Sequence, residues 1–160
     1  MQLMNYINGN FCPQTSGKWI TNLNPATGEE ICKVPISNSK DVKEAINSAK
    51  DAYPNWSKNT PHERAIWLDR IADKLEEMFE EIAQLESMDT GKPISLSRSV
   101  DANRSVTNFR FFSELIKGME IEEFEMKDAT NYVIQKPIGI GALITPWNLP
   151  LYLLSWKVAP

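Results

Sequence analysis

The chain has 160 residues, of which 42% are hydrophobic and 24% are charged, and this is the composition of an ordinary globular domain. Its net charge of -4 argues against a nucleic-acid surface, because the basic residues are scattered among acids. The longest apolar stretch, Leu149 to Leu154, is too short to span a membrane, and the amino end lacks the features of a signal peptide. We therefore expect a cytoplasmic protein that binds a small molecule or another subunit.

The cysteines and the single histidine indicate no catalytic or metal site. Cys12 falls in a loop-like stretch and Cys32 in a strand-like one, and neither has the spacing of a metal site or a neighbour that would activate a thiol. His62 falls in the first turn of a predicted helix, where exposure is the simplest interpretation. We predict structural roles for both cysteines, no catalytic role for His62 and no bound metal.

The first third of the chain predicts a β-ribbon followed by a helix. Residues 5 to 36 alternate strand-like runs with turn signals at Asn8-Gly9 and Thr27-Gly28. From Ser39, which we take as the N-cap, apolar residues from Val42 onward recur every three or four positions. This spacing predicts an amphipathic helix that ends near Trp56.

Two longer helices are predicted next. Thr60, Pro61 and Glu63 form a capping box at the start of the first, which Gly91 and Pro93 end. Its predicted apolar stripe consists of Trp67, Ile71, Leu75, Met78, Ile82 and Leu85. The other helix runs from Pro93 to Lys117, and its predicted inward residues are Leu96, Val100, Val106, Phe109 and either Phe111 or Phe112.

The last forty or so residues change character twice. Residues 119 to 136 alternate about a polar turn at Lys127 to Thr130, which predicts a β-hairpin. Residues 138 to 145 are small and apolar, as in a strand buried on both faces of a parallel sheet, and the residues from Leu149 onward begin another helix. Because a parallel strand needs neighbours, most of that sheet is expected to lie outside this sequence.

The turn Pro146-Trp147-Asn148 stands where α/β proteins bind ligands, at the carboxyl end of the predicted strand. Gly139 and Gly141 do not make a dinucleotide fingerprint, since Ile144 occupies the position of the third glycine. The alternative for Asn148 is a helix cap or Asx-turn, in which case Trp147 would belong to the core.

The run GALITPWNLPLYLLSWKVAP resembles the strand, turn and helix signature of the aldehyde dehydrogenase superfamily, in which a Trp-Lys pair follows the Pro-Trp-Asn turn. The segments YINGNF, NPATGEEI, AYPNW, TPHERA and MDTGKP are similar to further family motifs, in family order. DANRSVTNFRFFSEL and NLPLYLLSWKVAP look most like the branch that oxidises 2-aminomuconic and 2-hydroxymuconic semialdehydes.

This resemblance implies an α/β fold, present here as an incomplete amino-terminal part of the aldehyde dehydrogenase fold. Residues 1–118 would begin the NAD(P)-binding domain, and residues 119–136 would form an oligomerisation hairpin arm. Residues 137–160 would supply the first strand, the turn and a helix of a Rossmann-like parallel sheet. The full-length protein would be a homo-oligomer, either a dimer or a tetramer.

The resemblance also implies a reaction. In this family a cysteine thiolate attacks the aldehyde, an asparagine amide holds the resulting oxyanion, and hydride passes to NAD or NADP. Asn148 matches that asparagine. The stretch that matches the backbone wall beside the cofactor comprises Ile144, Thr145, Pro146 and Trp147. Lys157 matches a lysine of the proton relay, with an ordinary helix lysine as the alternative.

A semialdehyde substrate of this branch carries a carboxylate, for which a guanidinium is the natural partner. Arg104 falls where the branch places its substrate-facing arginine. Arg110 is the fallback, and a surface salt bridge is the alternative for either residue. A monovalent cation near Asn22, Leu23 and Asp89 is a further implication of the family resemblance.

No residue of this sequence matches the family's nucleophilic cysteine, its general-base glutamate or its dinucleotide-gripping Lys-Pro-Ser-Glu. We therefore expect the full-length parent to oxidise a carboxylate-bearing aldehyde and the 160 residues alone to be inactive. The alternative is a non-catalytic interaction module in which the helices and the acidic hairpin bind a partner. Exposure of residues 138 to 145 distinguishes the two, because a stand-alone module would cover them.

Overall fold

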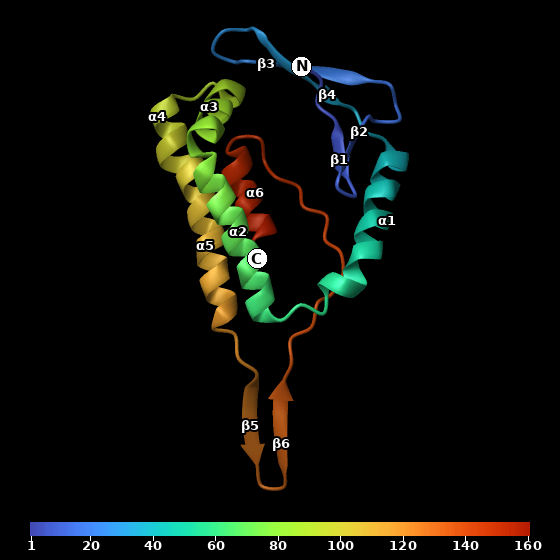
Figure 1. Ribbon diagram of the computed structural model, residues 1–160, viewed down its shortest axis with the longest axis vertical. Helices are drawn as coiled ribbons and strands as arrows, with labels where there is room; N and C mark the ends of the chain where they lie inside the picture. Colours follow the sequence, from blue (N-terminus) through green and yellow to red (C-terminus); the bar gives the residue numbers. More distant parts are fainter.

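The computed structural model describes residues 1–160 and begins with two antiparallel strand pairs (Figure 1). β1 (Asn5–Ile7) pairs with β2 (Asn10–Cys12), and β3 (Trp19–Leu23) pairs with β4 (Glu30–Pro35), which confirms the predicted ribbon. Asn8 and Gly9 have φ values of 52° and 75°, as a two-residue hairpin turn requires. Cys12 ends β2 and so does not lie in a loop, and both cysteines are free thiols.

The first helix, α1 (Ser39–Trp56), ends where the sequence predicts but begins with a different cap. Asn38 is the N-cap: its side chain accepts from the Lys40 N–H at 2.8 Å, while Asp41 accepts from the Asn38 N–H at 2.8 Å. Ser39 is already helical, so it cannot cap. Val42, expected on the inward face, is 53% exposed, because the short strand β1 covers that side of α1 only in part.

The predicted second helix is divided in two. α2 (Pro61–Glu77) begins at the expected capping box, in which Glu63 accepts from the Thr60 N–H at 2.7 Å. Met78 then leaves the helical conformation, with φ -96° and ψ 12°, and α3 (Phe79–Thr90) follows. The break lets α2 pack along the following long helix while α3 takes a different direction, so a single straight stripe does not form.

The predicted third helix is irregular near its start. It comprises α4 (Ile94–Leu96), a π-helical segment η1 (Ser97–Ala102) and α5 (Asn103–Lys117). The π segment buries Ser97 and Asp101 completely.

The core lies where α2, α5 and α6 (Pro150–Val158) meet (Figure 1). Its buried residues are Ala72, Phe109 and Ala159, against which Leu68, Leu75, Val106 and Phe112 pack. Small side chains let the helices approach closely, so the alanine face of α2 turns inward and two predicted core residues, Trp67 and Ile71, lie 47% and 38% exposed. Leu85, Leu96 and Phe111 are likewise exposed, and Phe112 is the inward phenylalanine.

The hairpin β5 (Glu122–Met126) and β6 (Ala129–Val133) is confirmed and projects away from the helices (Figure 1). The following segment runs back along the molecule to α6, and Tyr53 donates to the Pro137 carbonyl at 3.1 Å on the way. The expected strand at 138–145 does not form within these residues, and Ile138 and Ile144 are exposed. Its backbone groups lack a partner strand, without which a parallel strand is not stable. No helix has the length and apolarity needed to cross a membrane.

Candidate active site

The turn at Trp147 and Asn148 connects the extended segment to α6. α6 has Leu149 as its N-cap, without a side-chain hydrogen bond, so the cap interpretation of Asn148 is wrong. The helix end is satisfied from elsewhere, because Glu86 Oε1 accepts from the Leu151 N–H at 2.9 Å. Trp147 is 88% exposed and does not belong to the core. The Asn148 amide is therefore exposed and makes no hydrogen bond within the chain.

A cavity of about 630 Å³ opens beside this turn. It is lined by Asn22, Pro25, Asp89, Thr90, Lys92, Leu96, Trp147, Asn148 and Leu149. The turn thus faces the β3–β4 connection and the end of α3. Within the cavity wall Asn22 donates to Asp89 at 2.6 Å, so two residues that the family resemblance places beside a monovalent cation contact each other.

The other predicted site residues do not line this cavity. Ile144 and Pro146 are exposed and Thr145 is half-buried on the extended segment that precedes the turn. Lys157 lies exposed on α6, and Arg104 lies exposed on α5.

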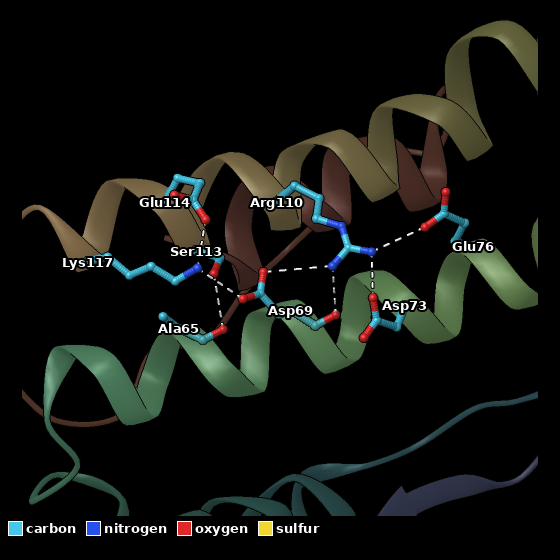
Figure 2. Close-up of polar contacts among 8 residues, drawn as sticks. All are labelled: Ala65, Asp69, Asp73, Glu76, Arg110, Ser113, Glu114 and Lys117. Carbon is cyan, nitrogen blue, oxygen red and sulfur yellow. Dashed lines mark hydrogen bonds and ion pairs between the residues drawn. The ribbon is translucent and has the colours of Figure 1, made fainter.

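The fallback arginine, Arg110, is occupied by carboxylates of α2 (Figure 2). Its guanidinium pairs with Asp73 and, at 3.2 Å and 3.8 Å, with Glu76 and Asp69. These contacts raise the pKa of Arg110, chiefly through the hydrogen bond with Asp73. Arg104 forms no ion pair or hydrogen bond through its side chain. The salt-bridge alternative therefore describes Arg110, and Arg104 keeps a free guanidinium.

Three charged residues form a buried cluster behind the turn, and the sequence did not predict it. Lys92 Nζ lies 2.8 Å from Asp101 Oδ2 and 3.9 Å from Glu86 Oε2, and the side chains of all three are at most 11% exposed. Lys92 also donates to the Asn148 carbonyl at 3.4 Å. Burial raises the pKa of the Glu86 carboxyl, and the nearby Asp101 adds to that rise. The only sign of this cluster in the sequence is that Lys92 lies in the family motif MDTGKP, which was interpreted only as the end of a helix.

Comparison with known proteins matches residues 11–160 to the aldehyde dehydrogenase family. The chain is 46% identical to the 2-aminomuconic semialdehyde dehydrogenase of Mus musculus, across 100% of this chain and 33% of that protein. It is 38% identical to the 2-hydroxymuconic semialdehyde dehydrogenase of Pseudomonas sp. (strain CF600), across 99% of this chain and 34% of that protein.

Among solved structures, PnpE in complex with nicotinamide adenine dinucleotide matches with a TM-score of 0.93, and PnpE from Pseudomonas sp. WBC-3 matches with a TM-score of 0.92, each at 39% identity. Each match covers 99% of this chain and 33% of PnpE. The chain thus spans about a third of the length of these relatives. The family match includes the motifs from NPATGEEI to the Trp-Lys pair, and it confirms the resemblance predicted from them: the chain belongs to the aldehyde dehydrogenase family.

Proposed function

We propose that the full-length gene product oxidises a carboxylate-bearing semialdehyde to the acid in the cytoplasm, with NAD as the hydride acceptor. The names of the two relatives described above, both semialdehyde dehydrogenases, support the substrate class. The complex of PnpE with nicotinamide adenine dinucleotide supports NAD, and NADP is the alternative cofactor. The apolar side chains of Ile144, Pro146 and Trp147 are exposed, which supports a cofactor beside this segment.

Asn148 is proposed to hold the oxyanion that forms when a thiolate attacks the aldehyde carbon. The observation that carries this role is a free amide on an anchored turn: the side chain is unpaired, while the main chain is held by Lys92 and, through Leu151, by Glu86. A neutral amide stabilises developing negative charge without giving up a proton that would prevent hydride departure. One such donor contributes about 3 kcal/mol to the transition state.

The remaining family assignments are part of the same proposal. Ile144, Thr145, Pro146 and Trp147 would border the cofactor, and Lys157 would take part in a proton relay. Arg104 would bind the substrate carboxylate, which its unpaired and exposed guanidinium supports. The free thiols do not serve as the nucleophile in this proposal, because Cys32 is buried and neither cysteine lines the cavity beside Asn148. The 160 residues alone are accordingly expected not to form NADH.

The hairpin of residues 119–136 is proposed to pair between subunits of a dimer or tetramer. Every residue of β5 and β6 is exposed, which supports an arm that is covered by another subunit. The stretch 138–145 is also uncovered, and a stand-alone interaction module would not leave it so. This exposure favours the enzyme over the non-catalytic alternative.

The test of the Asn148 role is the Asn148→Ala variant of the full-length gene product. With 2-hydroxymuconic semialdehyde as substrate and NADH absorbance as the readout, kcat should fall about 10²- to 10³-fold while KM changes little. Asn55→Ala, a change at an exposed asparagine of α1, is the matched control and should leave both constants unchanged. An undiminished kcat for Asn148→Ala would remove the proposed role.

A further inference from the structure

The charged cluster beneath the turn contacts the main chain at Asn148 itself and, three residues further on, at Leu151. Lys92 donates to Asp101 in η1 and to the Asn148 carbonyl, and it forms a longer ion pair, at 3.9 Å, with Glu86 in α3. An ammonium group has three N–H donors, so its short contact with Asp101 leaves it able to donate to the carbonyl as well. Glu86 uses its other oxygen to accept from the Leu151 N–H at 2.9 Å.

Neutral hydrogen bonds attach the helix that follows. Asn108 of α5 donates to Ser155 at 2.7 Å, and Ser155 donates to the Tyr152 carbonyl at 2.6 Å. α6 is therefore fastened to α5 independently of the charges. What the charged cluster adds is confined to the turn and the first turn of α6, namely contacts with the Asn148 carbonyl and the Leu151 N–H.

Stability alone does not explain this cluster. It contains two carboxylates for one ammonium, and one oxygen of each carboxylate, Glu86 Oε2 and Asp101 Oδ1, is buried without a hydrogen-bond partner. Well-packed apolar residues often stabilise a fold as well as a buried ion pair or better. A cluster that leaves two buried oxygens unsatisfied is better explained by the geometry that it imposes.

We propose that Lys92 and Glu86 are positioning residues that clamp the main chain at Asn148 and, three residues on, at Leu151, and thereby aim the Asn148 amide at the reacting oxygen. Asp101, which is completely buried, holds the Lys92 ammonium in place. The inference rests on the proposed role of Asn148. Displacement of a catalytic group by about 1 Å lowers turnover on the order of a hundredfold, so loss of the clamp should act on kcat.

The test must remove the short ion pair without adding to the charge imbalance of the cluster. Lys92→Met alone would leave two buried carboxylates without a cation, so the variant is Lys92→Met with Asp101→Asn, which keeps the net charge of the cluster unchanged. The matched control is Lys74→Met with Glu77→Gln, which removes an exposed ion pair of α2. Each pair is made in the full-length gene product with Asn148 intact and again with Asn148→Ala, and kcat, KM and the unfolding midpoint are measured.

The Lys92/Asp101 pair should lower kcat about tenfold or more when Asn148 is present and add almost nothing when Asn148 is absent. An equal fold-loss in both backgrounds, or no loss in either, would overturn the clamp while leaving the Asn148 role intact. An Asn148→Ala variant with normal kcat would overturn both proposals.

A second variant set serves if the double substitution prevents folding. Glu86→Gln keeps an oxygen that accepts from the Leu151 N–H and should retain most of kcat, whereas Glu86→Ala frees that N–H and should lower kcat. Equal values for the two variants would contradict the positioning role of Glu86.

Discussion

The two arginines of α5 are expected to have different roles: Arg110 stabilises the fold, and Arg104 binds the substrate. Arg110→Met removes a guanidinium that pairs with Asp69, Asp73 and Glu76 and is 40% exposed. Exposed ion pairs contribute about 0.2–1 kcal/mol each, and solvent screening keeps the sum for such a cluster at about 1–2 kcal/mol. We expect Arg110→Met to lower the unfolding midpoint by a few degrees, less so at high salt, and to leave KM unchanged.

Arg104→Met should behave in the opposite way. Its side chain has no partner in the protein, so the unfolding midpoint should stay near that of the parent. A charge-assisted pair with a substrate carboxylate is worth about 1.5–3 kcal/mol, which corresponds to a rise in KM of roughly tenfold to a hundredfold.

The assay compares 2-hydroxymuconic semialdehyde with an uncharged aldehyde, each followed through NADH absorbance in the full-length gene product. Arg104→Met should raise KM for the charged substrate only, and Arg104→Lys should recover part of the loss. The reasoning is refuted if Arg110→Met raises KM for the semialdehyde more than Arg104→Met does, or if Arg104→Met affects both aldehydes equally.

Two further predictions concern stability. Gly91→Ala should lower the unfolding midpoint more than Gly28→Ala: both positions have positive φ, 73° and 78°, but a Cβ at Gly91 would lie 3.1 Å from Pro25 Cβ, whereas at Gly28 nothing lies within 4 Å. Equal midpoints would show that the Pro25 contact relaxes freely. Glu86→Gln should change the pH dependence of unfolding. Because the pKa of Glu86 is raised in the folded protein, its contribution to the free energy of unfolding is fully present below pH 4.5 and is lost as the pH rises through its folded-state pKa. The variant should therefore gain in urea resistance relative to the parent as the pH rises above 4.5, and a constant difference across pH would contradict the assignment.

Local signals in the sequence predicted much of the fold because they depend on few residues. The capping box at Thr60 and the turn at Asn8-Gly9 are short-range features whose hydrogen bonds form wherever the backbone allows. Gly91 ends α3 with φ 73°, as the sequence suggested. Such signals need no knowledge of what lies across the fold.

Features that depend on distant partners were harder to predict. Spacing alone could not show that α2 turns Ala72 inward and Trp67 outward, because the choice between its faces is made by α5. The apolar pattern of residues 138–145 predicted a strand, yet a strand forms only beside another. The role of Asn148 that the sequence suggested stays a prediction. The cluster at Lys92 joins residues that are distant in the chain and leaves no periodic trace in the sequence.

The π-helical segment at Ser97–Ala102 has a consequence for how this region tolerates changes of length. Each residue of an α-helix advances about 100° around its axis, and the wider π turn accommodates a residue that a regular helix of the same span would not. Deleting one residue there would rotate α4 against α5, so Asp101 could no longer face Lys92 while Phe109 kept its place. Substitutions at exposed Ser99 should be mild, whereas insertions and deletions between Gly91 and Asn108 should be strongly selected against.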